Sequence, residues 1–564
     1  MPFKLVQPRD EVEIHLPDGR VLSGPRGAAV GEFLSAIEHD SQFVGAIING
    51  DLRELTFPIT MDARVDPVTM STSDGTRIYR RSLAFLLEVA FEEKHPQASL
   101  SIDHSVASGG FYCEVKGRKP LTQPELDALK DSMRALVEAD LPFERKEVPL
   151  QEATEYFFGR AEMDKIRLLK YRHKDYLTLY RLKEYMDYHH GYMTPSTGYL
   201  QWFDLVLAGD GFILLYPNRQ NPNELLPTSN HPKLLATFLQ YGGWLEKLGI
   251  SNVGALNDAL ESGRGGEIVL VSEALHEQRL AQIAYQVAER VNRTHLILVS
   301  GPSSAGKTTF AKRLMVQLLA LGISPFPLEL DNYFLPRHET PLDETGKPDF
   351  EALAALDLPL LADHLQKMIR GEETQLPRYN FKTGLREEGE SIRLTRGQPI
   401  ILEGIHGLDP LLIPENLRGE AFRIYISALT QLNLDRHNRI STTDTRLLRR
   451  IVRDARERGY TAQQTISRWE SVRYGEVKHI FPFQENADVM FNSALVYEMA
   501  ALKPLAEPLL RQVQHGEPEF IEAKRLLAFL EWFISLDTNF VPETSILREF
   551  LGGSILKDFT VWKK

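Results

Sequence analysis

The first seventy residues mix short stretches in which polar and apolar residues alternate with a stretch of helical spacing. Residues 11–16 (EVEIHL) alternate and are followed by the turn sequence PDGR and by VLS, which predicts a β-hairpin. Residues 30–37 have helical spacing, and residues 43–50 are typical of a strand followed by a turn. We therefore expect a small α+β module over residues 1–70.

The pattern that follows predicts a second α+β region. Helical spacing and strand-like apolar runs succeed each other, with helices expected at 80–93, 122–139 and 151–168 and strands at 109–115, 199–208 and 211–217. We interpret residues 71–230 as a second domain and residues 231–292 as a helical connector.

A third pattern begins at the apolar strand HLILVS (295–300). Two further apolar stretches, at 326–334 and 399–408, contain strands expected to end at Asp331 and at Glu403, and helical patterns separate the strands. Strands that alternate with helices predict an α/β domain with a parallel sheet, which we place at 293–500. A helical segment, 501–564, completes this multidomain prediction.

Composition narrows the class of protein. A chain of 564 residues is too long for a single core, and its formal charge of −12 argues against a general attraction to nucleic acid. The single cysteine, Cys113, cannot form an intrachain disulfide, which fits a reducing compartment. The N-terminus lacks the apolar core of a signal peptide, and no apolar run approaches the ~18 residues that a membrane helix needs. We expect a soluble cytoplasmic protein.

The stretch GPSSAGKTT contains the pattern G-x-x-x-x-G-K-[ST] between an apolar strand and a helical pattern. Its glycines allow backbone N–H groups to surround phosphate oxygens, and the helix N-terminus adds its positive dipole end. Lys307 is expected to reach the β- and γ-phosphates, and Thr308 to bind Mg²⁺. The stretch therefore predicts a site for ATP with Mg²⁺, the phosphate loop, formed by Gly301, Pro302, Ser303, Ser304, Ala305, Gly306, Lys307, Thr308 and Thr309.

Two acidic residues follow predicted strands of the same domain. Asp331 ends the strand FPLELDNYF, and a carboxylate at the carboxyl end of a parallel strand faces the ligand crevice, where it could accept a proton from a hydroxyl. Glu403 ends another strand and is a candidate for the magnesium shell. Each residue has a plainer alternative, since Asp331 could be an ordinary strand-end residue and Glu403 could cap a turn.

Arginines gather on a predicted helix at 444–459, the arginine helix (DTRLLRRIVRDARERG). Such a helix can close on a triphosphate, stabilise the transferring charge and exclude water. The alternative is a solvated charged face. LPRYNFKTG (376–384) places Tyr379 in a predicted loop, where it could contact a ligand or pack against neighbours.

From about residue 295 to 500, these stretches together resemble the uridine kinase and phosphoribulokinase family. The resemblance implies ATP-dependent phosphorylation of a hydroxyl, with Asp331 as the base and Arg450, Arg453 and Arg458 near the phosphates. For the acceptor it implies contacts from Asp331, Asp349, Tyr379 and Arg450. The chain departs from the uridine kinase pattern at Gly384, which stands where a base-contacting histidine is usual.

The front half resembles two modules of threonyl-tRNA synthetase. Residues through VGAIINGDLRELTFPI are similar to a TGS domain, and the following region is similar to the second additional domain of the synthetase. That domain normally carries an H-S-x-x-H pair and a C-x-x-x-H pair. Here Arg81 and Phe85 stand for the first pair, and His189 and Met193 for the second. We therefore expect binding or regulation from the front half, with RNA or a small-molecule effector as ligand, rather than editing chemistry.

The sequence predicts an ATP-dependent nucleoside kinase that transfers the γ-phosphate to a hydroxyl. Two alternatives remain open: an RNA- or translation-linked regulatory protein that uses its ATP site as a switch, and a sugar-phosphate kinase. The partner expected from the kinase reading is a small-molecule acceptor, and self-association into a homo-oligomer is also left open.

Overall fold

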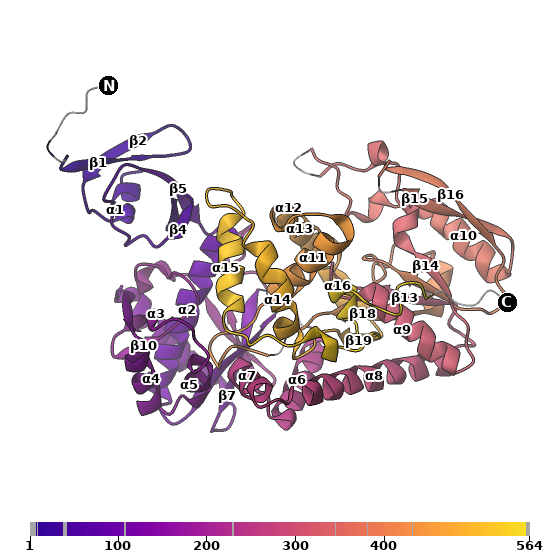
Figure 1. The fold of residues 1–564 in the computed structure, drawn as a ribbon, viewed down its shortest axis with the longest axis horizontal. Coiled ribbons are helices and arrows are strands. Elements are labelled where there is room, and N and C mark those ends of the chain that lie inside the picture. The colour runs from indigo at the N-terminus through magenta and orange to yellow at the C-terminus, as the bar shows by residue number, and fades with distance from the viewer. Residues whose placement is uncertain are drawn as a thin grey trace.

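The computed structural model describes residues 7, 9–37, 42–106, 109–227, 231–343, 346–380, 382–430 and 432–559. Figure 1 shows the chain from its small N-terminal module, through a second α+β region and a row of helices, to a large α/β region. Residues 560–564 of the predicted C-terminal helical segment lie outside the described residues. Within the described residues, no helix combines the length and the apolar character that crossing a bilayer requires.

The N-terminal module is one five-stranded sheet packed against a short helix, α1 (Val30–Ser35). The predicted hairpin is confirmed, since β1 pairs antiparallel with β2. Buried aliphatic side chains such as Val12 and Ile14 point from alternate positions of β1 into the core, which explains the alternating pattern. In sheet order the strands are β2 (Val21–Pro25), β1 (Glu11–His15), β5 (Ala63–Thr69), β3 (Phe43–Ile48) and β4 (Asp51–Arg53).

The second region builds two antiparallel sheets around the long helix α2 (Ser73–Lys94). One sheet has the order β11-β12-β7-β6 and the other β10-β9-β8. The remaining elements, in chain order, are β6 (Ser99–Val106), β7 (Gly110–Lys116), α3 (Gln123–Glu138), β8 (Glu144–Pro149), α4 (Leu150–Gly159), α5 (Met163–Leu169), β9 (Tyr176–Leu182), β10 (Tyr185–Asp187), β11 (Asp204–Ala208) and β12 (Gly211–Leu215).

Two predictions for this region were wrong in extent. The helix expected over 151–168 is two helices, because the chain turns after α4 and Ala161 adopts a left-handed conformation with φ 57°. The strand expected over 199–208 is β11 alone, which begins at Asp204 after a single turn of 3₁₀ helix at Thr197–Tyr199.

Three helices follow, as the pattern of residues 231–292 predicts: α6 (Pro232–Leu248), α7 (Val253–Glu261) and α8 (Gly265–Glu289). The long helix α8 runs along the lower edge of Figure 1 and reaches the α/β region. There Arg313 on α9 (Lys307–Ala320) forms a 3.0 Å ion pair with Glu277 on α8.

The α/β region contains a five-stranded sheet in which every pairing is parallel, so the predicted fold class is confirmed. Its strand order is β14 (Phe326–Glu329), β17 (Ile400–Glu403), β13 (Leu296–Ser300), β18 (Ala421–Ser427) and β19 (Val489–Asn492). The first strand in sequence, β13, is therefore the central one, and its five residues are all buried. Parallel strands buried on both faces are near-continuous apolar runs, as these are.

Helices and one hairpin complete this region. The hairpin of β15 (Thr374–Asn380) and β16 (Leu385–Ile392) replaces the loop that the sequence predicted over 376–384. The arginine helix is α11 (Thr442–Arg458), as expected. The other helices are α10 (Leu358–Arg370), α12 (Ala462–Ser467), α13 (Trp469–His479), α14 (Glu498–Leu510), α15 (Phe520–Leu530) and α16 (Arg548–Leu551).

Candidate active site

The phosphate loop joins the central strand β13 to helix α9, as the motif predicts. Gly301 has φ 156°, and a Cβ atom on it would lie 1.9 Å from the carbonyl oxygen of Ile426 on the neighbouring strand. Gly306 has φ 86° and is the last residue before the helix. Only glycine fits the close approach at the first position, and glycine is favoured by the left-handed backbone at the second. The motif glycines therefore shape the loop directly.

Lys307 and Thr308 begin helix α9 and carry the polar groups of the loop. The Lys307 ammonium donates a 3.2 Å hydrogen bond to the carbonyl oxygen of Pro302, which places it across the loop. The Thr308 hydroxyl donates to the Glu403 carboxylate over 3.1 Å. These two side chains lie where a triphosphate and its cation would meet the N-terminal end of the helix.

The rest of the loop is held from below by buried partners. The N–H of Ser303 donates to Glu476 over 3.0 Å, and Arg446 donates to the carbonyl oxygen of the same serine, also over 3.0 Å. The Ala305 carbonyl accepts from the hydroxyl of Ser493, over 2.5 Å. Buried hydrogen bonds of this kind fix the loop before any ligand arrives.

Asp331 lies beside the loop but not on a strand. The predicted strand through it stops at Glu329, and Asp331 sits in the 3₁₀ turn Leu330–Tyr333 that follows. Its side chain is exposed, desolvation by neighbouring atoms raises the pKa of its carboxyl group, and the charges of Lys307 and Arg458 oppose that shift. A carboxylate in this position, near two cations at the edge of the sheet, can act as a general base that takes the proton of an acceptor hydroxyl as the hydroxyl reacts.

Glu403 ends the adjacent strand β17 and is the best-placed metal ligand among the predicted residues. Burial raises the pKa of its carboxyl group to about 7, with further upward contributions from Asp331, Glu329 and Glu549, against the opposing charge of Lys307. The Thr308 hydroxyl and the Glu403 carboxylate, which contact each other, are oxygen donors of the kind that Mg²⁺ prefers. Thr308 and Glu403 therefore fit such an ion.

The arginines of α11 divide into two groups that the sequence did not distinguish. Arg446 and Arg449 are fully buried, and their guanidinium groups pair with Glu476 and Glu498, respectively. They therefore hold the arginine helix to the domain core.

The predicted catalytic arginines lie on the more open face of α11. Arg450 donates a 2.9 Å hydrogen bond to the Ser303 hydroxyl and so touches the phosphate loop. Arg453 and Arg458 lie 2.9 Å and 3.5 Å from Asp454, and the charge of Arg458 acts on Asp331. The structure thus brings Arg450 and Arg458 to the loop and to Asp331, whereas Arg453 is paired within its own helix.

Of the predicted acceptor residues, Tyr379 contacts Asn332, the chain neighbour of Asp331, and Asp349 contacts Glu351. Tyr379 is on strand β15 rather than in a loop; its backbone N–H donates to Asn332 over 3.2 Å, and its ring packs 5.7 Å from that of Phe334. Asp349 accepts from the backbone of Glu351 and lies 3.4 Å from His479.

Glu351 is a residue that the sequence reasoning missed. Burial raises the pKa of its carboxyl group to about 7, Glu476 adds to that rise, and Arg450 and Lys307 lower it. Its position two residues after Asp349 was the available signal. A carboxyl group with a pKa near neutrality, close to the loop lysine, marks it as part of the site.

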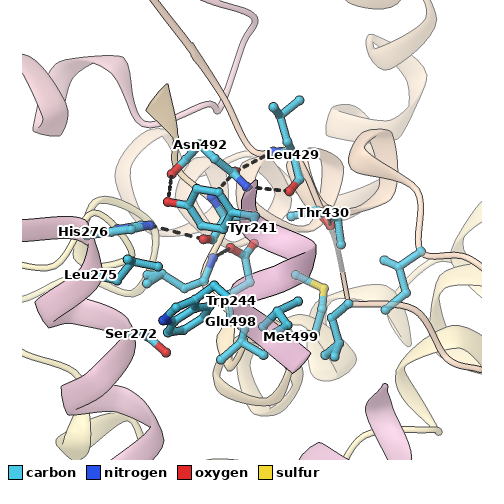
Figure 2. A pocket seen from close by; sticks show the side chains of 17 residues that line it. Tyr241, Trp244, Ser272, Leu275, His276, Leu429, Thr430, Asn492, Glu498 and Met499 are labelled. Atoms are coloured by element: carbon cyan, nitrogen blue, oxygen red, sulfur yellow. Dashed lines mark hydrogen bonds between the residues drawn. The ribbon is translucent and has the colours of Figure 1, made fainter. Parts of the chain in front are cut away.

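A separate pocket lies between the connector helices and the α/β region (Figure 2). Tyr241 donates to the carbonyl oxygen of Asn492 over 3.1 Å, and His276 lies 3.3 Å from that of Ala494. The pocket holds about 30 Å³ and is lined mostly by apolar side chains, which is room for a water molecule or two. It is too small for a nucleotide, and its apolar lining packs the connector helices against the α/β region.

The four positions that carry editing chemistry in the resembled synthetase domain do not form a catalytic set here. Arg81 donates to the carbonyl oxygen of Tyr192 over 2.5 Å, and the ring of Phe85 packs 5.4 Å from that of His189. Met193 is buried, and burial lowers the pKa of His189 to about 3. The imidazole is enclosed and neutral, and its Nε2 lies 3.5 Å from the buried carboxylate of Glu88, so the histidine is held in a structural contact.

A loop of the α/β region reaches into this part of the front half. The loop between β18 and α11 carries His437, whose Nδ1 lies 2.8 Å from Asp187 and 3.3 Å from Glu88. Lys165, which is 1% exposed, also contacts Asp187 and lies 3.2 Å from the same imidazole nitrogen. These three acceptors could hold a cation, and the lysine ammonium already lies among them. The front half is therefore fastened to the loop that leads into the arginine helix.

The parallel sheet, with the phosphate loop between its central strand and helix α9, has the arrangement of a P-loop nucleotide-binding domain. Residues 296–500 match the family model described as the phosphoribulokinase / uridine kinase family. Among solved structures, a possible uridine kinase from Bacillus stearothermophilus is 19% identical with a TM-score of 0.24, over 35% of this chain and 89% of that one. A putative fructose transport system kinase from Silicibacter sp. TM1040 is 17% identical with a TM-score of 0.28, over 38% and 98%.

The N-terminal part is similar to threonine–tRNA ligases. Threonine–tRNA ligase 2 of Bacillus subtilis (strain 168) is 32% identical over 205 residues, and the ligase of Lawsonia intracellularis (strain PHE/MN1-00) is 29% identical over 204 residues. In both cases the match covers 36% of this chain and 32% of the relative. The chain thus spans about a third of the length of the curated relatives it matches.

Proposed function

We propose that this protein is an ATP-dependent phosphotransferase that transfers the γ-phosphate to a hydroxyl of a small molecule, most simply a nucleoside. The observation that carries the proposal is the meeting of three elements at one edge of the sheet. The phosphate loop follows β13, Glu403 ends the adjacent strand β17, and Asp331 follows β14, the next strand along. Ligands of open parallel sheets bind outside the carboxyl ends of the strands.

The residues suggest a direct in-line transfer. Asp331 orients the acceptor hydroxyl and takes its proton, and the freed oxygen bonds to the γ-phosphorus as the bond to the bridging β–γ oxygen breaks, which releases ADP. The Lys307 ammonium stabilises the negative charge of the γ-phosphoryl group during its transfer. Arg450 and Arg458, on the arginine helix, stabilise the same charge. A Mg²⁺ ion, when held by Thr308 and Glu403, supplies neutralisation of the phosphate charge.

The residues at the tip of the β15–β16 hairpin argue against recognition of a pyrimidine base. Gly384 has φ 72°, and a Cβ atom there would lie 2.9 Å from the side chain of Arg337. The space that a base-contacting histidine would need is therefore taken by an arginine. A guanidinium group at this hairpin also suits an anionic acceptor, so a sugar phosphate is the second candidate.

We assign residues 1–70 and 71–230 to the two synthetase-like modules, 231–292 to the connector, 293–500 to the kinase and 501–564 to the C-terminal helical segment. For the front half we propose a regulatory role, in which RNA or a small-molecule effector acts on the arginine helix through the loop that carries His437.

The test is a screen of nucleosides and sugar phosphates for acceptor-stimulated release of ADP. The wild type should release ADP faster with at least one acceptor, and Lys307→Ala should abolish that release because the charge that follows the γ-phosphate is lost. Lys367→Ala is the matched control, since that ammonium pairs with Asp363, one turn earlier in α10. Wild-type turnover in folded Lys307→Ala would contradict the site, and no stimulation by any acceptor would favour the switch.

A further inference from the structure

The end of the chain lies against the phosphate loop, more than two hundred residues away in sequence. Residues 541–559, the C-terminal cap, include helix α16 (Arg548–Leu551), which Figure 1 shows beside α11 and α9. A Cβ atom on Gly306 would lie 2.6 Å from a methyl group of Ile546. The cap therefore packs directly against the phosphate loop.

One carboxylate of the cap sits on the loop itself. Glu549 accepts a 2.8 Å hydrogen bond from the Thr309 hydroxyl and a 3.3 Å hydrogen bond from the backbone N–H of the same residue. Thr309 is in the first turn of α9, where free N–H groups and the helix dipole favour an anion. These are donors of the kind that cradle the α- and β-phosphates in a phosphate loop.

The remainder of the cap is fixed firmly enough to stay in place when that carboxylate moves. Ile546, Leu547 and Phe550 are fully buried. Arg456 of the arginine helix donates to the carbonyl oxygens of Glu549 and Phe550, and Lys312 donates to those of Leu556 and Lys557. The side chain of Glu549 can leave Thr309 by rotation, while the backbone that carries it stays anchored.

We propose that Glu549 is an internal occupant of the nucleotide site, whose carboxylate must leave Thr309 before the phosphates of a nucleotide can bind. This inference rests on the proposed function, because it assigns a second occupant to the same loop. A carboxylate and a phosphate cannot share the donors of Thr309, and their like charges repel each other at this distance. The cap thus lowers the apparent affinity for nucleotide and links it to the position of the arginine helix, which holds the cap by Arg456.

The experiment measures the dissociation constants of ADP and ATP by titration calorimetry, with and without Mg²⁺, in the full chain. Glu549→Gln and Glu549→Ala should each bind nucleotide roughly five- to tenfold more tightly than the wild type, because a charge-assisted hydrogen bond no longer competes. Glu543→Gln is the matched control, since it removes the same charge from an exposed position in the same cap and should change affinity less than twofold.

The outcomes separate this inference from the proposed function. If the wild type binds ATP and both Glu549 variants bind it equally or more weakly, Glu549 is not a competitor, and the kinase assignment stands. If the wild type and every variant fail to bind ATP or ADP, the nucleotide site itself is wrong, and the inference falls with it. Binding by Glu549→Ala alone would support both.

Discussion

Replacing Asp331 with asparagine separates a kinase from a nucleotide switch. The substitution keeps the size of the side chain and one acceptor oxygen but removes the charge that would take the acceptor proton. General-base assistance is typically worth about 10²–10⁴-fold, so acceptor-stimulated ADP release should fall by about that factor, or about 3–5 kcal/mol of activation free energy.

The structure predicts a different result for ATP binding. The charge of Asp331 contributes to the raised pKa values of Glu403 and Glu351. Removing that charge favours the ionised form of Glu403, which is the form that binds a cation. The affinity for Mg²⁺ and ATP should therefore stay the same or increase slightly, while turnover is lost.

The assay measures ATP affinity and acceptor-stimulated ADP release side by side in Asp331→Asn. Glu329→Gln is the matched control, because that exposed carboxylate, two residues earlier, also raises the pKa of Glu403 but ends a strand outside the turn. The control should keep turnover within about fivefold of the wild type. An equal loss of affinity and turnover in Asp331→Asn would make the residue a metal or structural group, and unchanged turnover would refute its role.

Two further predictions concern the framework of the site. Glu476→Ala leaves the guanidinium of Arg446 buried without its partner, and breaking such a pair typically costs about 3–5 kcal/mol of unfolding free energy, measurable by urea denaturation. Glu457→Ala, which breaks an exposed pair, should cost less than about 1 kcal/mol, and an equally small loss in Glu476→Ala would contradict the structural role. Because the pKa of Glu403 is raised to about 7, lowering the pH from 8 to 6 protonates it and should weaken Mg²⁺-dependent binding of ATP roughly tenfold. A pH-independent requirement for Mg²⁺ would exclude Glu403 as a ligand.

Much of the α/β region could be predicted because its signals are local. The phosphate loop is made by consecutive backbone N–H groups, so the spacing of Gly301, Gly306 and Lys307 was sufficient to identify it. The strands of the sheet were also predictable, because strands that are buried on both faces are nearly continuous apolar runs in the sequence. The similarity of the front half to threonine–tRNA ligases was visible in its residues, and its departures from the editing pairs of the resembled domain were visible at Arg81, Phe85 and Met193.

Tertiary structure decided which of these residues meet. The same helix carries Arg446 and Arg450, yet one is buried against Glu476 and the other reaches Ser303, because the face of α11 that turns inward depends on what packs against it. Glu549 reaches Thr309, 240 positions away, through folding of the whole chain. Neither contact has a local signal, since hydrophobic spacing records burial but not the partner that causes it. The sequence by itself determined a phosphate loop in a parallel α/β domain, and only the packing of distant segments determined what surrounds that loop.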